Sequence, residues 1–309
     1  MHLLIPHAAA LSDASMHTLR GLELPQLRRL LARLSPTRCD GSDEYTLTPP
    51  HERALAQALG LHGDDGALPW AAAQAAADGV DTQALAWGLL TPVHWQVGRD
   101  QVSLVDPAEL KLSDAESRQL FDAVRPLFES EGFVLAYGAP LRWYAAHDTL
   151  EGLPNAAIDR AIGRNINLWL PQHPQARLIR RLQSEVQMLL YNNAVNDQRE
   201  ARGELPVNSF WLSGCGKRQN VHPAPDVIVD DSLRTPLLRA DWPAWADAWR
   251  ALDAGAIAAL NARAAGEPVM LTLCGERYAQ RLEPAPLTIR QRLARRWNAP
   301  EPRTLLETL

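Results

Sequence analysis

Apolar residues recur with helical spacing in several parts of the chain. In Leu22–Leu34 and in Gln175–Tyr191 they stand three and four positions apart, which predicts helices with one buried face each. Pro49-Pro50 is expected to open a helix over His51–Leu61, because proline is tolerated in a first turn. Asp241 is expected to cap a helix whose aromatic residues share one stripe. We interpret that stripe as core packing and not as a binding platform; its members are Trp242, Trp245 and Trp249.

Short apolar runs predict strands. His2–Pro6 is interpreted as a buried strand, and Pro268–Leu273 as another. Val207–Leu212 and Val227–Val229 are apolar at successive positions, which predicts central parallel strands buried on both faces. Cys39–Thr48, by contrast, is predicted as a polar loop.

A different order of elements begins at Trp87. Two strands, Gly88–Val97 and Gln101–Val105, are expected to be followed by a helix that Ser113 and Glu116 begin as a capping box. One or two further strands are expected over residues 133–145. Strand, strand, helix and strand in this order predict a small α/β subdomain that can be inserted in a larger sheet.

The chain is therefore expected to have four segments. Residues 1–86 form the first part of an α/β core, 87–150 the small insertion, 151–286 the second part of the core, and 287–309 a basic tail. The tail is predicted to contain a helix over 288–296. Its arginines could contact RNA, anionic lipid or an acidic partner, but a solvated face is the more common meaning; they are Arg290, Arg292, Arg295 and Arg296.

Composition narrows the classes of function. Of 309 residues, 46% are hydrophobic and 22% are charged, which is typical of a globular protein. A net charge of −5 argues against a dedicated nucleic-acid binder, and no apolar stretch is long enough to span a membrane. The first residues lack the basic leader of a signal peptide. Three cysteines without a CxxC pair favour a reducing, cytoplasmic location.

The most informative segment is Asn192–Lys217. A helix leads into a polar turn, and the apolar run that follows breaks into Gly214-Cys215-Gly216-Lys217. This pattern predicts a buried strand that ends in a flexible basic loop. Backbone N–H groups and a lysine in such a loop could receive an anion.

The same segment resembles cofactor-independent phosphoglycerate mutases of the archaeal type. Pro49–Leu61 and Gly66–Gly79 resemble other segments of that family, in the same order. Trp211–Gly214 and Leu271–Gly275 also resemble the bacterial RpfE-type regulatory proteins. The resemblance implies an alkaline-phosphatase-like, three-layer α/β fold with a small insertion domain. The positions that carry the likeness in the first segment are Asn196, Arg199, Gly203, Asn208, Trp211, Gly214, Gly216 and Lys217.

The resemblance also implies a hydroxyl nucleophile and two divalent metal ions, and this chain departs from that pattern. His51 stands at the position of the family's serine nucleophile. Pro6-His7-Ala8 stands where the first strand should end in Asp-Gly, and Leu271–Glu276 where metal-binding residues are expected. No histidine follows His222. We therefore expect no catalytic residue of the family's type, no metal site and no cofactor.

The anion-binding half of the site could have survived. Arg142, Arg199 and Lys217 are candidates to clamp the phosphate or carboxylate of a small metabolite. Asn196 and Asn208 would fix the loops between them, and Gly214 and Gly216 would present backbone N–H groups. Alternatively, Arg199 and Asn208 simply hold the connection after the helix.

The expected function is a catalytically degenerate mutase-like protein with a regulatory or metabolite-binding role. Two alternatives remain open. One is an active mutase or phosphatase with a rearranged centre, in which His51 becomes phosphorylated. The other is a non-catalytic interaction protein, although the sequence names no protein partner.

Overall fold

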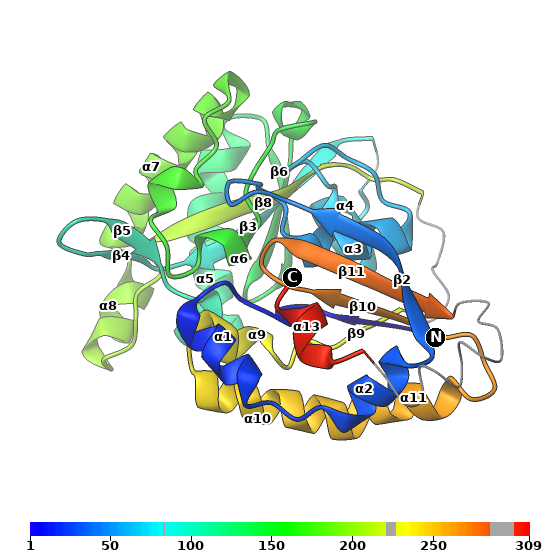
Figure 1. Ribbon diagram of the computed structural model, residues 1–309. Coiled ribbons are helices and arrows are strands. Elements are labelled where there is room, and N and C mark those ends of the chain that lie inside the picture. Colours follow the sequence, from blue (N-terminus) through cyan, green and yellow to red (C-terminus); the bar gives the residue numbers. More distant parts are fainter. Residues whose placement is uncertain (83, 221–226, 285–299) are drawn as a thin grey trace. The chain divides into compact units, whose positions relative to one another are not determined.

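The computed structural model describes residues 1–82, 84–220, 227–284 and 300–309 (Figure 1). The chain forms two compact units. Unit 1 comprises Met1–Tyr45, Pro49–Gly60 and His222–Leu309, and unit 2 comprises Thr46–Thr48 and Leu61–Val221. The basic helix expected over 288–296 lies outside the described residues.

Unit 1 contains a five-stranded sheet in its described part, with the order β2-β11-β10-β1-β9. β1 (His2–Ile5) is parallel to both β10 (Met270–Cys274) and β9 (Val227–Val229). β11 (Tyr278–Pro284) is antiparallel to β10 and to β2 (Leu34–Gly41). Two expectations need correction. β9 lies at the edge of the sheet and not at its centre, and β2 includes residues that were predicted as a polar loop.

Helices cover both faces of this sheet. Alternate residues of β1 point to opposite sides: Leu3 and Ile5 pack in a large apolar cluster with the residues of α2 and α10, whereas Leu4 packs with Ala54 of α3. Unit 1 is thus a mixed α/β structure in three layers. Its helices are α1 (Asp13–Arg20), α2 (Pro25–Leu31), α3 (Pro50–Leu59), α9 (Arg234–Leu238), α10 (Trp242–Leu252), α11 (Ala258–Arg263) and α13 (Pro302–Leu306), with a π-helical turn at Asp253–Ile257 (Figure 1).

The tryptophan stripe of α10 belongs to the core, as predicted. Trp245 and Trp249 are fully buried, and their rings meet edge to face at 6.3 Å between centroids. Asp241 caps the helix by accepting a hydrogen bond from the Ala244 N–H at 3.1 Å. The buried Asp253 carboxylate, in the π-helical turn after α10, accepts hydrogen bonds from the N–H groups of Gln26 and Leu27 and so caps α2.

Unit 2 is built on an antiparallel sheet with the strand order β6-β7-β3-β8. The bounds are β3 (Ala86–Val93), β6 (Val134–Ala139), β7 (Arg142–Ala146) and β8 (Ser209–Lys217). β8, predicted as a central parallel strand, is an edge strand antiparallel to β3. A separate hairpin pairs β4 (Trp95–Val97) with β5 (Val102–Leu104). The single strand predicted over Gly88–Val97 is therefore divided between β3 and β4, which belong to different sheets.

Two layers of helices pack against the sheet of unit 2. α5 and α7 cover one face around Phe121 and Trp143, and α4 covers the other around Tyr144. The capping box of α5 is present, with Ser113 and Glu116 bonded to each other's backbone N–H groups. The longer helices are α4 (Trp70–Ala77), α5 (Asp114–Glu129), α7 (Arg177–Tyr191) and α8 (Ala194–Ala201), with short turns at Pro107–Leu110, Asp148–Leu150, Ile158–Ala161, Ile166–Leu168 and Pro174–Ala176 (Figure 1).

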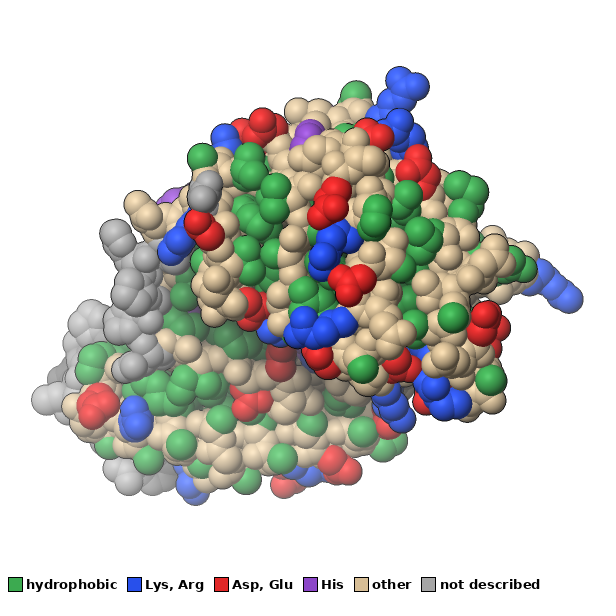
Figure 2. All heavy atoms as spheres, turned by 180° about the vertical axis from the view of Figure 1, so that it is seen from behind, with side chains coloured by type: hydrophobic (Ala, Val, Ile, Leu, Met, Phe, Trp, Pro, Cys, Tyr) green, Lys and Arg blue, Asp and Glu red, His purple; other side chains and the backbone are tan. Residues whose placement is uncertain are grey.

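The expected elements of the 87–150 segment all lie in unit 2. This unit extends beyond them to include β8 and the helices up to residue 221. In the described part of the chain, no helix combines the length and the apolar character needed to cross a bilayer. On the face of the molecule in Figure 2, acidic and basic side chains are interspersed and do not form a field of one sign.

A buried histidine makes the stability of unit 1 sensitive to pH. His2 is 2% exposed on β1, and its Nε2 lies 2.8 Å from Thr272 Oγ1 on β10. Burial, aided by the charge of Arg281, lowers the pKa of His2 to about 4 from 6.5. The folded state therefore favours the neutral form of His2. The stability that neutral His2 contributes is complete above pH 6.5 and is lost as the pH falls toward 4.

We expect the free energy of unfolding to fall by about 1 kcal/mol more in the wild type than in His2→Gln between pH 7 and pH 5.5. Urea denaturation of both proteins at the two pH values measures this difference. The exposed His17 of α1 offers a control, because His17→Gln should behave as the wild type does. Identical pH profiles for the wild type and His2→Gln would contradict the prediction.

Candidate functional site

The glycines predicted to form an anion-binding loop lie inside a strand. β8 continues through Gly214, Cys215 and Gly216, and its pairing with β3 is shifted by an irregularity between Trp87 and Leu89. The expectation of a flexible loop is therefore wrong. The break in the apolar pattern comes from a bulged edge strand, whose extra residue and positive φ angles glycine accommodates.

The start of α4 packs directly on these glycines. A Cβ atom added at Gly214 would lie 2.9 Å from the backbone nitrogen of Ala71, and one added at Gly216 would lie 2.9 Å from Pro69 Cβ. Neither distance is compatible with a side chain. The two glycines thus serve the close approach of a helix to a strand.

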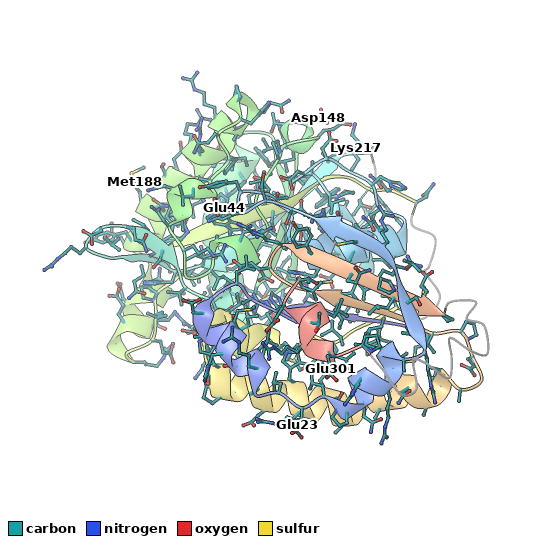
Figure 3. The ribbon with its side chains drawn as sticks, viewed as in Figure 1. Glu23, Glu44, Asp148, Met188, Lys217 and Glu301 are labelled. Carbon is teal, nitrogen blue, oxygen red and sulfur yellow. The ribbon has the colours of Figure 1, made fainter. Side chains whose placement is uncertain are left out.

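Lys217 lies at the exposed end of β8. Its Nζ is 2.7 Å from Glu151 Oε2, and both side chains are about half exposed. Asp148 lies nearby (Figure 3), and hydrogen bonding to Glu151 raises the pKa of Lys217. An exposed pair of this kind contributes little stability.

Arg142 binds a carboxylate on α4's side of the sheet. Its Nε and Nη2 donate to the two oxygens of Asp78 at 3.1 and 3.0 Å, and the Tyr144 hydroxyl donates to the same carboxylate at 2.6 Å. Hydrogen bonds from Arg142 and then Tyr144 lower the pKa of Asp78. A Cβ at Gly138 would lie 2.5 Å from Asp78 Oδ2, so glycine is needed there for this contact to form.

The Arg199 side chain is 1% exposed, and its contacts hold neighbouring segments of the fold together. Its Nε donates to the Leu205 carbonyl at 2.9 Å, its Nη2 donates to the Leu110 carbonyl, and its Nη1 is 3.2 Å from Glu116 Oε1. Burial acts to raise the pKa of Glu116, but hydrogen bonds from Ser113 and the charge of Arg199 outweigh it and lower the pKa to about 2. The buried guanidinium therefore ties α8 to the start of α5.

Asn196 and Asn208 are bonded to the backbone. The Asn196 amide donates to the carbonyls of Leu190 and Val207 and accepts from the Val207 N–H, so it joins the end of α7 to the segment before β8. Asn208 exchanges two hydrogen bonds with the backbone of Trp95, at 2.7 and 2.9 Å. These contacts agree with the alternative in which the motif holds the connection after the helix.

The three cations do not converge, which corrects the hypothesis of a common clamp. Lys217 pairs with Ala86 at one end of β3, whereas Arg142 precedes Trp143, which pairs with Leu90. At about 3.4 Å per residue, these two positions are separated by about 15 Å along the sheet. Arg142 lies on the side of α4, whereas Arg199 contacts the start of α5, which covers the opposite face.

The structure brings together two other residues, both in unit 1. His7 follows β1, and His51 lies in the first turn of α3; their ring centroids are 4.8 Å apart. The Ala8 N–H donates to the Cys274 carbonyl at the end of β10, so the pair lies at the carboxyl ends of two parallel strands. Open α/β sheets bind their ligands at this edge. His7 and His51 therefore form the candidate functional site.

His7 has an uncommon backbone conformation. Its φ angle is 57°, a value that few residues other than glycine adopt, although histidine is enriched among them. The surrounding core holds this conformation, because the fully buried Trp245 donates its Nε1–H to the His7 carbonyl at 3.2 Å. Backbone strain of this kind clusters at functional sites.

The sequence identified both histidines but did not predict that they meet. His51 was placed at the position of the family's serine, and His7 was noted only as part of Pro6-His7-Ala8, where the family's first strand ends in Asp-Gly. The available signal was that the resemblance assigns the two positions to one centre. At these two places the side chains offer imidazole nitrogens instead of hydroxyl and carboxylate oxygens, and imidazole nitrogen suits a transition metal.

The cysteines are poor candidates for chemistry. Cys215 and Cys274 are fully buried, and burial raises the pKa of each thiol far above its usual range. The thiolate, which is the reactive form, is thereby disfavoured. Both residues serve as packing groups.

Comparisons with known proteins give weak likenesses. No protein-family model matches the chain, and no curated protein matches it. Among solved structures, it is similar to the cofactor-independent phosphoglycerate mutase of Thermoplasma acidophilum DSM 1728, at 14% identity over 93% of this chain and 90% of that one, with a TM-score of 0.38. It is also similar to a protein of Pyrococcus horikoshii, at 11% identity over 95% and 92%, with a TM-score of 0.41. Neither likeness is close enough to carry a conclusion about activity.

Proposed function

We propose that this chain is a catalytically degenerate protein of the phosphoglycerate mutase type, with a regulatory or metabolite-binding role. One observation carries the proposal. His51, which the resemblance places at the position of the serine nucleophile, adjoins His7 of Pro6-His7-Ala8, the segment that stands where the family's first strand ends in Asp-Gly.

The chemistry of the family depends on groups that these positions lack. A hydroxyl nucleophile is activated when a metal ion lowers its pKa, and carboxylates hold that ion. His7 and His51 supply neither the hydroxyl nor the carboxylate. The proposal therefore places this protein outside phosphoryl transfer by the family's route.

An active mutase or phosphatase with a rearranged centre is the first alternative. Histidine can act as a nucleophile, and His51 lies near a second imidazole. The cations that were expected to stabilise a transferred phosphoryl group have carboxylate partners, Arg142 with Asp78, Arg199 with Glu116 and Lys217 with Glu151. This observation favours the non-catalytic proposal.

An activity assay separates these two functions. The purified chain, supplied in turn with Mg²⁺, Mn²⁺ and Zn²⁺, is expected to interconvert 2- and 3-phosphoglycerate no faster than a blank without protein. Turnover that disappears in His51→Ala and persists in His17→Ala would show that the proposal is incorrect.

A role as a non-catalytic interaction protein is the second alternative, and the structural use of Arg199 and Asn196 favours it. A thermal-shift screen with phosphoglycerates and sugar phosphates distinguishes it from metabolite binding. A ligand at about 100 times its Kd stabilises the folded state by about 2.7 kcal/mol, so binding should raise Tm. An unchanged Tm across the screen would favour the interaction protein.

A further inference from the structure

The His7–His51 pair has a donor set that recognises a particular class of ion. One ring nitrogen of each residue lies within 4.8 Å of one on the other. Two nitrogens that bind the same tetrahedral ion at 2.0–2.1 Å stand about 3.3 Å apart. A small rotation of the imidazole rings therefore suffices to bring both nitrogens to one ion.

The elements around the pair support such a site. The His7 backbone is fixed by Trp245 and by the parallel pairing of β1 with β10, while His51 is carried by the first turn of α3. Sites on strand ends and helices are held more precisely than sites on loops. His7 is 9% exposed and His51 is half-buried, so the pair is shielded but accessible to a small ion.

The type of donor selects the type of ion. Imidazole nitrogen suits zinc, copper and nickel, whereas magnesium and manganese prefer carboxylate and water oxygens.

We propose that His7 and His51 together bind one transition-metal ion of the zinc, nickel or copper type. The site differs from the one that the family resemblance implies, because it uses no hydroxyl nucleophile and holds one ion instead of two. It goes beyond the proposed function, since metal binding here needs no turnover.

Isothermal titration calorimetry on the full chain, freed of metal by a chelator, tests the proposal with Zn²⁺, Ni²⁺ and Mg²⁺. The exposed Cys39 can bind zinc adventitiously, so all proteins carry Cys39→Ser. We expect one Zn²⁺ or Ni²⁺ per chain and no measurable Mg²⁺ binding. His7→Asn and His51→Gln should each weaken the affinity at least about tenfold, since loss of an outer-shell partner alone costs 10–100-fold.

Two controls keep the result interpretable. Asparagine tolerates the positive φ of position 7, so His7→Asn removes the imidazole without forcing the backbone to change. His17→Gln, on the exposed face of α1, should bind metal as the parent does. Electron paramagnetic resonance of bound Cu²⁺ should show two imidazole nitrogens in the parent and one in either variant.

Several outcomes would overturn the proposal. They are the absence of zinc and nickel binding, binding that is equally strong in His7→Asn and His51→Gln, and magnesium binding as tight as that of zinc. Because the calorimetry needs no substrate, its failure leaves the activity assay of the proposed function unaffected.

Discussion

Arg199→Met is expected to lower the free energy of unfolding by about 3–5 kcal/mol, the usual cost of removing one partner from a buried ion pair. Arg199 is 1% exposed, and its guanidinium serves two backbone carbonyls and the Glu116 carboxylate. Methionine fills much of the same volume but offers no donor. The carbonyls of Leu205 and Leu110 would then be left in the interior without this partner.

Lys217→Met provides the matched comparison, because the sequence placed both cations in the same anion clamp. The Lys217–Glu151 pair is about half exposed, so its loss should cost far less stability than the loss of the buried Arg199. Urea denaturation at pH 7 measures both values. Equal, small effects of the two substitutions would contradict the structural role assigned to Arg199.

The pH dependence adds a second test of the Arg199 contact. Glu116 has a pKa of about 2, below its usual 4.5, so it contributes stability that is present above pH 4.5 and is lost as the pH falls toward 2. Arg199 supplies part of that shift. The stability difference between the wild type and Arg199→Met should therefore shrink as the pH falls through this range.

Gly214→Ala is expected to destabilise the fold by about 2–5 kcal/mol. Its φ of 65° costs a residue with a Cβ about 1–2 kcal/mol, and overpacking costs a further 1–3 kcal/mol. The new methyl group would lie 2.9 Å from the backbone nitrogen of Ala71 and 3.0 Å from Trp70 Cβ. Because backbone atoms of α4 cannot move aside as a flexible side chain can, β8 and α4 would have to separate.

Gly203→Ala isolates the packing part of this effect. Gly203 has a similar φ of 72°, but an added Cβ would meet nothing within 4 Å. Only the backbone cost of about 1–2 kcal/mol is expected there. If both alanine variants lost the same stability in urea denaturation, the close packing of α4 on Gly214 would not be what requires glycine.

The helices could be predicted from sequence because their signals are local. The capping box of Ser113 and Glu116 and the apolar stripe of α10 require only residues within a few turns of each other. β2 was missed for the opposite reason. Its polar residues resemble a loop, and only the pairing with β11, about 240 residues later in the chain, makes them a strand.

For the candidate site, too, some features could be predicted from the sequence and others required the tertiary structure. The sequence motif around Gly214 and Arg199 was recognised correctly as unusual, but an anion clamp and a structural junction use the same residue types. Contacts decided between them, since Ala71 covers the glycine and Glu116 neutralises the arginine. Pro49-Pro50 predicted that His51 lies in the first turn of a helix, whereas its proximity to His7 emerged only in three dimensions.

The sequence by itself determined the mixed α/β character and the main helices with their caps, and it drew attention to His51. Only the tertiary structure decided the direction of β8, the separation of the three cations and the meeting of the two imidazoles. The physical reason is the separation along the chain between the residues on which each feature depends. Caps and amphipathic stripes depend on neighbours a few residues away, whereas strand direction, ion pairing and convergence of side chains depend on segments that the chain brings together only by folding.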